Sequence, residues 1–534
     1  MNIKQVTDSK EVDQRLAALM TNAGAVQAVA AAVEGTLGPK GLDTMLVDRF
    51  GTVTVTNDGV TILEEMEATH PAAKMLINTA RAQEKEIGDG TTTATVWAGA
   101  LVSEGLNQVL RGVPVAHVIE GLQIGIRRAL ECFDQRRRPV QGCDDPLLRQ
   151  VALVSGRGNE EIADLVVQAA LLVGPEKLGD PGFKLRDSVF AAASVDSAVF
   201  EGVLISRGRW HKQMPASMEA PRVLVIDDAL APEELDEGAL ATEAGFNRYL
   251  ALETEFHDNI AKIIGMGVSL ILVDRRIDDT AGEMLADAGV IALSRVATRE
   301  WRRAAEHTGA WPVKRTALKK NPVELARYLG RARRAWEDEK QEQFRIEGGG
   351  GKPCATVLVG AATEEVLGER ERIAKDAASA VQAALNGGVV PGGGTVELAV
   401  GRDLEAVKPG LKGMTVYGVE CVAAALKRTF TQIVANAGFN PLEKLGDAVS
   451  AQIAAGSDCL GIDCDSGALV DFWELGIIDP LPVKTNALRA AGELAQAVLR
   501  IDTIIKKRVP RPEGTEAGTA GQRLDSMPKR GDDF

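Results

Sequence analysis

Residues 88–93 read Gly-Asp-Gly-Thr-Thr-Thr, and this short stretch constrains the chain more than any other. Glycines on both sides of Asp89 indicate a tight turn, because glycine adopts backbone angles that other residues resist. The threonines that follow open a predicted helix. The first turn of a helix has unsatisfied N–H groups and a partial positive charge, which suits it to bind phosphate. Asp89 offers an oxygen ligand for Mg²⁺. An ordinary helix cap with a glycine turn is the alternative.

Two earlier turns have the same character. A predicted helix over 12–34 ends at the glycine-containing loop 35–41, which lacks the Walker A pattern and could be a plain helix-to-strand turn. Alternating apolar residues over 44–47 and 52–56 then predict a β-hairpin. Asp58 follows the hairpin at a helix start, where simple N-capping is the alternative to a functional role.

Composition excludes several classes of protein. The chain has 534 residues, room for two to four domains, and its net charge of −14 argues against a nucleic-acid-binding role. Six cysteines without framework spacing suggest a reducing compartment, and Cys459 and Cys464 fit buried thiols better than a zinc site. The start is polar, which predicts no signal peptide, and no apolar run is expected to span a membrane. These features predict a soluble cytoplasmic protein.

Changes in pattern along the chain suggest several domains. The charged run 136–145, the region near Gly202 and the glycines at 348–351 read as boundaries. Between the last two, short apolar runs alternate with helical segments, which predicts a small parallel α/β domain interrupted by an acidic insertion at 228–253. Residues 396–505 are predicted to be mainly helical. The tail after Val509 is predicted to be disordered.

Several motifs in one order resemble the chaperonins, the Hsp60/thermosome family, over nearly the whole chain up to about Val509. They are Thr-Leu-Gly-Pro-Lys-Gly at 36–41, Thr-Asn-Asp-Gly-Val-Thr at 56–61, the stretch at 88–93, Lys-Asp-Ala at 375–377 and Val-Val-Pro-Gly-Gly-Gly at 389–394. Residues 55–93, Asn-Ala-Gly-Phe-Asn-Pro at 436–441 and 499–505 are similar to the group II branch. The Ala-, Arg- and Gly-rich background also fits a group II-like chaperonin from a bacterium, the so-called group III.

The resemblance implies a multidomain α/β chaperonin fold. A mainly helical equatorial ATPase domain would comprise residues 1–138 and 393–534. A small intermediate hinge domain would comprise 139–197 and 356–392. An α/β apical domain for substrate binding would comprise 198–355, with a helical lid protrusion at about 228–253.

The resemblance also assigns residues to an ATP site. The positions matching nucleotide contacts are Thr36, Leu37, Gly38, Pro39, Asn57, Asp89, Gly90, Thr91, Thr92, Thr93, Gly393, Asp463 and Asp479, with Asp463 the looser match. Asp89 would hold Mg²⁺. Asp376 matches the carboxylate that swings over the site and polarises the attacking water, and Asp58 a second carboxylate beside it. Arg157 stands where group II members often have Lys, so a γ-phosphate-sensing role is implied with a larger, planar head group.

The implied function is that of an ATP-dependent folding machine. Its partners would be copies of itself in stacked rings and non-native polypeptides, with no separate co-chaperonin lid, no nucleic acid and no membrane. A ring-forming scaffold without folding activity is the alternative, although Asp58, Asp89 and Asp376 argue against it. A small-molecule kinase is a third possibility, but no motif for a second substrate is evident.

Overall fold

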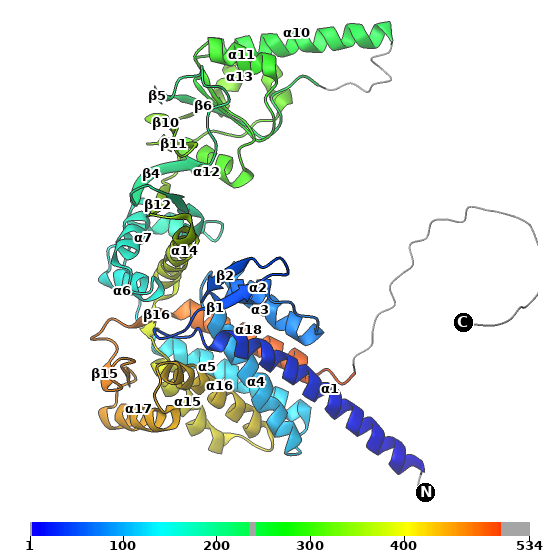
Figure 1. Ribbon diagram of the computed structural model, residues 1–534, viewed down its shortest axis with the longest axis vertical. Helices are drawn as coiled ribbons and strands as arrows, with labels where there is room; N and C mark the ends of the chain where they lie inside the picture. The colour runs from blue at the N-terminus through cyan, green and yellow to red at the C-terminus, as the bar shows by residue number, and fades with distance from the viewer. Residues whose placement is uncertain (1–2, 234–241, 504–534) are drawn as a thin grey trace, which may run out of the picture.

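The structure, a computed structural model, describes residues 3–233 and 242–503. Three lobes are stacked along the long axis of the molecule (Figure 1). The chain starts in a helical lobe, passes through a middle lobe into a distal lobe, and returns by the same route. Both ends of the described chain therefore lie in the helical lobe.

The helical lobe has one core built from the first and last parts of the chain. Residues 19–133 and 390–499 contribute to a single apolar cluster, in which α4 and α16 are also joined by the buried Trp97 Nε1, which donates to Thr429 Oγ1 at 2.7 Å. The elements before the excursion are α1 (Ile3–Glu34), β1 (Thr44–Val47), β2 (Val53–Thr56), α2 (Gly59–Glu65), α3 (Pro71–Glu86), α4 (Thr91–Leu110) and α5 (Val115–Gln135). Those after it are β13 (Val389–Pro391), α15 (Thr395–Val407), η4 (Lys408–Gly410), α16 (Thr415–Asn436), α17 (Pro441–Ala455), β14 (Leu460–Ile462), β15 (Leu469–Asp471), β16 (Ile478–Pro480) and α18 (Leu481–Leu499).

The middle lobe packs alanine-rich helices on a short sheet. Its apolar cluster combines residues 143–189 with 355–389 and includes Ala374, Ala377, Ala378 and Val381 from α14. Small side chains allow α14 to approach α6 and α7 closely. The elements are α6 (Pro146–Ser155), α7 (Glu160–Val173), α8 (Pro175–Leu178), η1 (Leu185–Ser188), β3 (Val189–Ala193), β12 (Ala355–Ala361) and α14 (Glu364–Gly387).

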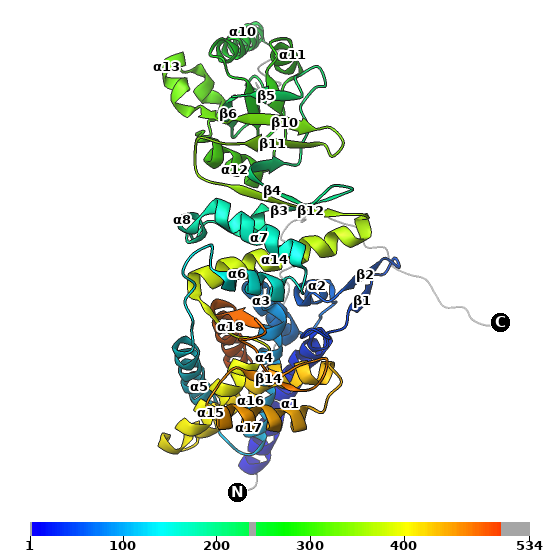
Figure 2. The ribbon, with the colours of Figure 1, turned by 90° about the vertical axis from the view of Figure 1, so that its left-hand side faces the viewer.

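The distal lobe contains the predicted parallel strands. Strand β7 pairs in parallel with β6 and β8, and β9 joins the edge antiparallel to β6. Helix α10 projects from this lobe, as Figures 1 and 2 show from two sides. The elements are β4 (Ala198–Ile205), β5 (Ser217–Glu219), β6 (Arg222–Ile226), α10 (Glu243–Gly265), β7 (Leu270–Val273), α11 (Asp279–Asp287), β8 (Ile291–Leu293), α12 (Thr298–Thr308), η2 (Arg315–Lys319), α13 (Pro322–Leu325), η3 (Ala326–Tyr328), β9 (Gly330–Arg331), β10 (Arg334–Asp338) and β11 (Gln343–Glu347).

One sheet connects the middle and distal lobes. Its strand order is β3-β12-β4-β11-β10-β5. Residues 198–201 of β4 pair with β12, and residues 202–205 pair with β11, so the partner changes at Gly202. Gly202 has φ 154°, and a Cβ there would lie 2.3 Å from the carbonyl oxygen of Ile346, so the crossing requires glycine.

Several local predictions are confirmed. The hairpin pairs Thr44 with Thr56 and Val47 with Val53. The first helix begins earlier than predicted, at Ile3, and α10 begins at Glu243, inside the segment 228–253 predicted as an acidic insertion. Residues 234–241 of the predicted lid segment, and the tail predicted to be disordered, lie outside the described residues.

The expectation that no apolar run is long enough to span a membrane is wrong. Within the described residues, Leu16–Glu34 of α1 is long enough and apolar enough to do so. The stretch supplies Leu19, Val26, Val29 and Val33 to the core of the helical lobe. Its apolar character is thus explained by packing against the neighbouring helices.

Glycine at the crossing of α5 and α16 is required for stability. A Cβ on Gly418 would lie 2.3 Å from the carbonyl oxygen of Val118 and 2.6 Å from Cα of Gly121. We expect Gly418→Ala to destabilise the protein by about 3 kcal/mol through overpacking, measured as a lower thermal unfolding temperature. Gly446 in α17 meets nothing within 4 Å, so Gly446→Ala is the control and should be neutral or slightly stabilising. Equal behaviour of the two variants would contradict the packing argument.

Candidate functional site

The turn at residues 88–90 begins helix α4, as the sequence predicted. Gly88 and Gly90 have φ 85° and 78°, and Gly90 is the N-cap residue of α4 with no side-chain hydrogen bond to the cap. The N–H groups of the first turn, which carries Thr91, Thr92 and Thr93, are therefore not used by a capping side chain. Such a helix start can bind the oxygens of a phosphate.

The side chain of Gln83 in α3 stabilises this turn by hydrogen bonds. Its Nε2 donates to the carbonyl oxygen of Asp89 at 2.7 Å and to that of Val483 at 3.2 Å. Asn486 Nδ2 donates to Gln83 Oε1 at 2.7 Å, so one hydrogen-bond network joins α3, the turn and α18. Nothing in the local sequence of α3 distinguished Gln83, since its partners on α18, Val483 and Asn486, lie about 400 residues away.

Asp89 has limited hydrogen bonding and a raised pKa. Its Oδ1 accepts from the N–H of Gly90 at 2.6 Å, and its Oδ2 accepts from Ser155 Oγ of the middle lobe at 3.4 Å. Burial raises the pKa of Asp89 to about 6, against the effect of the Gly90 hydrogen bond, and the charges of Asp479 and Glu84 also raise it. A carboxylate held in this way is suited to meet a cation.

Asp58 lies on a neighbouring turn. It is the N-cap of α2: its carboxylate accepts from Val60 N at 3.3 Å, Thr61 N at 3.0 Å and Thr61 Oγ1 at 2.6 Å. The capping alternative therefore describes its local role. A Cβ on Gly59 would lie 2.3 Å from Thr92 Oγ1, which places this turn directly against the start of α4. Beside it, the buried Asn57 Oδ1 has no hydrogen-bond partner among the described residues.

Asp376 comes from α14 of the middle lobe, and negatively charged side chains of the helical lobe act on it. Burial raises the pKa of Asp376 well above its ordinary value, and the negative charges of Asp89, Asp58 and Glu84 raise it further. The positive charge of Arg157 opposes the shift. A carboxylate with a raised pKa at the joint between two lobes is a candidate proton acceptor.

Arg157 is anchored next to α14. It has a left-handed φ of 53° in the turn between α6 and α7, and its guanidinium forms an ion pair with Glu369 of α14. The sequence did not indicate Glu369. In this conformation the Arg157 head group is thus held by the helix that carries Asp376.

The second glycine-rich turn meets Asp479. Strands β13 and β16 pair Val390 with Asp479, and a Cβ on Gly392 would lie 3.1 Å from Asp479 Oδ1. Gly393 has φ 60° and Gly394, at φ 84°, is the uncapped N-cap of α15. The structure therefore brings together Gly393 and Asp479, which are far apart in sequence.

A buried charge network fixes Asp479. Lys484 Nζ lies 2.7 Å from Asp479 Oδ2 and 2.5 Å from Glu397 Oε1, and both Lys484 and Glu397 are buried. Burial lowers the pKa of Lys484, but the two carboxylates together raise it above its ordinary value, so the lysine is charged. Sequence reasoning missed Lys484 and Glu397; the apolar helices around them gave no indication of a buried ion pair.

The loop Thr36–Pro39 is tied to the end of α16. Asn436 Nδ2 donates to the carbonyl oxygens of Glu34 and Leu37, each at 2.9 Å. Lys40 forms an ion pair with Asp465 in the turn that contains Asp463. Asp463 itself accepts from Ser466 Oγ at 2.5 Å and from the N–H of Asp465 and Ser466, so its oxygens stabilise its own turn.

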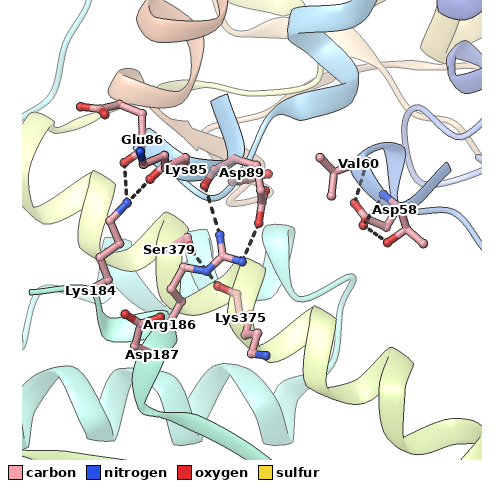
Figure 3. Close-up of polar contacts among 12 residues, drawn as sticks. Asp58, Val60, Lys85, Glu86, Asp89, Lys184, Arg186, Asp187, Lys375 and Ser379 are labelled. Atoms are coloured by element: carbon pink, nitrogen blue, oxygen red, sulfur yellow. Dashed lines mark hydrogen bonds and ion pairs between the residues drawn. The ribbon is translucent and has the colours of Figure 1, made fainter. Parts of the chain in front are cut away.

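Two cations of the middle lobe reach the end of α3 just before the Asp89 turn. Figure 3 shows Lys184 at Lys85 and Glu86, and Arg186 close to Ser379 of α14 and to the Asp89 turn. Arg186 Nη2 lies 2.5 Å from Glu84 Oε1. None of these residues was singled out from the sequence, because the contacts cross between lobes.

The donor set fits a magnesium ion that is bound together with phosphate. Among residues 3–233 and 242–503 the structure has no group of three His, Cys, Asp or Glu side chains placed to hold a metal by themselves. Mg²⁺ is usually bound through one or two carboxylates, with substrate phosphates and water completing its shell. Asp89 provides such a carboxylate beside the start of α4, whose N-cap makes no side-chain hydrogen bond.

Protonation of Asp89 should affect the stability of the protein without nucleotide or metal. Because its folded pKa is raised from 3.8 to about 6, the folded state retains this proton longer than the unfolded state. Stability from this group is therefore full below pH 3.8, falls as the pH rises to 6, and stays reduced above. The loss amounts to about 3 kcal/mol.

We expect Asp89→Asn to raise the thermal unfolding temperature at pH 7.5, with a smaller gain at pH 4. Asp258, exposed on α10, is the control site, and Asp258→Asn should give no pH-dependent gain. An Asp89→Asn variant no more stable than wild type at pH 7.5 would contradict a destabilising effect of this charge.

Comparison with known proteins identifies the family. The sequence model of the TCP-1/cpn60 chaperonin family matches residues 29–509. The chain is 33% identical to the thermosome subunit beta of Aeropyrum pernix, with 91% of each chain covered, and 33% identical to that of Archaeoglobus fulgidus, with 95% covered. It is also similar to a solved structure of a group III chaperonin in the open state, with a TM-score of 0.84 and 46% identity over 92% of this chain and all of that one. The predicted resemblance and fold class are confirmed, and the chain belongs to the TCP-1/cpn60 chaperonin family.

Proposed function

We propose that the chain binds ATP with Mg²⁺ where the helical and middle lobes meet, and uses its hydrolysis to open and close a cavity around non-native polypeptide. Membership of the family makes the chain a ring-forming, ATP-dependent chaperonin subunit. The observation that carries the site proposal is the contact of the middle lobe with the Asp89 turn: a Cβ on Gly88 would lie 2.4 Å from Ser379 Oγ of α14, the helix that carries Asp376, and Ser155 Oγ donates to Asp89 Oδ2 at 3.4 Å.

The three lobes would correspond to three domains. The equatorial domain would comprise 1–138 and 393–534, the intermediate domain 139–197 and 356–392, and the apical domain 198–355. The apolar clusters support this division, since the first joins both ends of the chain and the second joins two segments on either side of the distal lobe. The sheet that continues through Gly202 connects the intermediate and apical domains.

The nucleotide would lie among the uncapped glycine turns of the helical lobe. Its phosphates would meet the loop Thr36–Pro39, Asn57 and the helix start Gly90–Thr93, while Gly393 and Asp479 would line the nucleoside end. The orphaned Asn57 Oδ1 supports a polar ligand there, because buried oxygen acceptors normally have a donor. Asp463 is a weaker candidate because its oxygens are occupied within its own turn.

Asp89 would hold Mg²⁺, which supplies charge neutralisation at the β and γ phosphates. Asp376 would orient the attacking water and accept its proton, and Asp58 would support it while capping α2. Arg157 would stabilise negative charge near the γ-phosphate once released from Glu369. Because Asp376 and Arg157 belong to the middle lobe, the site is complete only when the lobes are correctly placed.

The partners would be other copies of the chain. Met45, Val47, Phe50, Val53 and Val55 are exposed on the β1–β2 hairpin, and these strands pair only with each other in the described chain. An exposed apolar hairpin with open edges is unfavourable unless another chain covers it. This supports subunit association, as stacked rings require.

The protrusion at about 228–253 would form a built-in lid, so that no co-chaperonin is needed. Its described part supports this, because Phe246 and Leu250 are exposed on the free end of α10. The conformation would be the open one, given the similarity to an open-state chaperonin. A cytoplasmic location is also proposed, and all six cysteines are free thiols, as a reducing compartment allows.

Asp376→Ala should separate binding from hydrolysis. We expect magnesium-ATP to bind nearly as in wild type while turnover falls about 10²- to 10⁴-fold, the usual cost of losing a general base. Phosphate release and calorimetric binding measure the two quantities. Asp258→Ala, an exposed change on α10, is the control. Turnover near the wild-type rate in Asp376→Ala would remove this residue from the mechanism.

ATP should protect the lid segment from proteolysis. If the protrusions converge in the closed ring, residues 228–253 should be cut readily without nucleotide and resist cutting with ADP and aluminium fluoride, which mimic the transition state. The cleavage sites can be read by mass spectrometry. Equal cutting in both states, or folding that requires an added lid protein, would contradict a built-in lid.

A further inference from the structure

Two cationic side chains of the middle lobe, Lys184 and Arg186, contact the C-terminal end of α3 in the helical lobe. Lys184 Nζ donates to the carbonyl oxygen of Lys85 and, at 3.3 Å, to that of Glu86. Arg186 Nη1 donates to the carbonyl oxygen of Glu84 at 3.3 Å, while Nη2 pairs with the Glu84 carboxylate at 2.5 Å. Carbonyls at a helix end lack intrahelical partners and carry partial negative charge, so cations are favourable there.

Only one of these cations also reaches the turn before Asp89. A Cβ on Gly88 would lie 2.5 Å from Arg186 Nη1 and 2.4 Å from Ser379 Oγ. The backbone of Gly88 is thus enclosed between the Arg186 guanidinium and α14, one residue before Asp89. Lys184 Nζ donates instead to the carbonyls of Lys85 and Glu86.

The pair is also placed to balance charge at the site. The side chains of Arg186 and Glu84 are 22% and 24% exposed, so water screens them only in part. The charge of Glu84 acts on both Asp89 and Asp376. Arg186 therefore compensates a carboxylate that would otherwise add to the repulsion among the site carboxylates.

We propose that Arg186 is a positioning residue of the nucleotide site: from the middle lobe it fixes the Gly88 turn and so presents Asp89 to magnesium-nucleotide. The proposal rests on the magnesium role given to Asp89 and extends the site across the joint. The planar guanidinium contacts the Glu84 carboxylate, the Glu84 carbonyl and Gly88 at once, which a single ammonium group cannot reproduce. Binding of the nucleotide and the relative placement of the two lobes are linked through this one side chain.

The test is the magnesium-dependent part of ADP affinity. Calorimetry on the assembled protein gives the Kd for ADP with Mg²⁺ and with EDTA, and their ratio is the gain that magnesium provides. Residues that support a metal ligand typically change metal affinity about 10- to 100-fold when mutated. We expect Arg186→Met to reduce the gain at least about tenfold, Arg186→Lys to restore part of it, and the matched control Lys184→Met to keep it within about twofold. ADP affinity in EDTA should change little in all three.

The proposal is overturned if Arg186→Met keeps the wild-type ratio of the two Kd values. It is also overturned if Lys184→Met lowers that ratio as much as Arg186→Met does, because any contact between the lobes at this helix end would then have the same effect. Light scattering establishes whether each variant assembles. If Arg186→Met fails to assemble, Arg186→Lys provides the test. A wild-type ratio of the two Kd values in Arg186→Lys would contradict a role for the planar guanidinium. If Mg²⁺ does not change the ADP affinity of the wild-type protein, the magnesium role of Asp89 is wrong. Failure of the proposed magnesium site is thus distinguished from failure of the Arg186 proposal.

Discussion

Repulsion among carboxylates at the joint between the helical and middle lobes is the constraint on which the rest of the site depends. Burial raises the pKa values of Asp89 and Asp376 there. The negative charge of Glu84 raises both further, and the charges of Asp89 and Asp58 also raise the pKa of Asp376. Such a cluster is costly unless cations are near. Arg157 and Arg186 provide fixed positive charge from the middle lobe, and a metal-bound nucleotide would provide the remainder. Ligand binding and lobe placement are then physically linked, because both relieve the same repulsion.

The surrounding fold makes this joint possible. The chain leaves the helical lobe after α5 and returns at β13, so the two halves of one core carry the two glycine-rich turns. Buried polar groups lock those turns: Gln83 holds the first, and the Glu397–Lys484–Asp479 network holds the second. The two glycine-rich turns are therefore held within the helical lobe, while α14 and η1 belong to a separate core and contact the site from the middle lobe. A site divided in this way can respond to movement of one lobe.

Local chemistry made much of this predictable from the sequence. The hairpin, the parallel strands and the helix starts at Asp58 and Gly90 followed from periodicity and turn residues. The contacts of Gln83, Lys484 and Arg186 could not be found, because each joins residues far apart in the chain or in different lobes. The resemblance supplied the pairing of the first and last segments, which no local pattern encodes. For Asp463 the resemblance suggested a nucleotide contact, whereas in the structure its carboxylate accepts a hydrogen bond from Ser466 in its own turn.

The central claim is that Asp89 and Asp376, from different lobes, act on one bound nucleotide. The most direct measurement is an electron cryo-microscopy structure of the assembled protein with Mg²⁺, ADP and aluminium fluoride. The account predicts a magnesium ion on Asp89, the fluoride group at the start of α4, and the carboxylate of Asp376 within hydrogen-bond distance of the attacking water. A nucleotide bound elsewhere, or an Asp376 that remains remote from a fully occupied site, would contradict it.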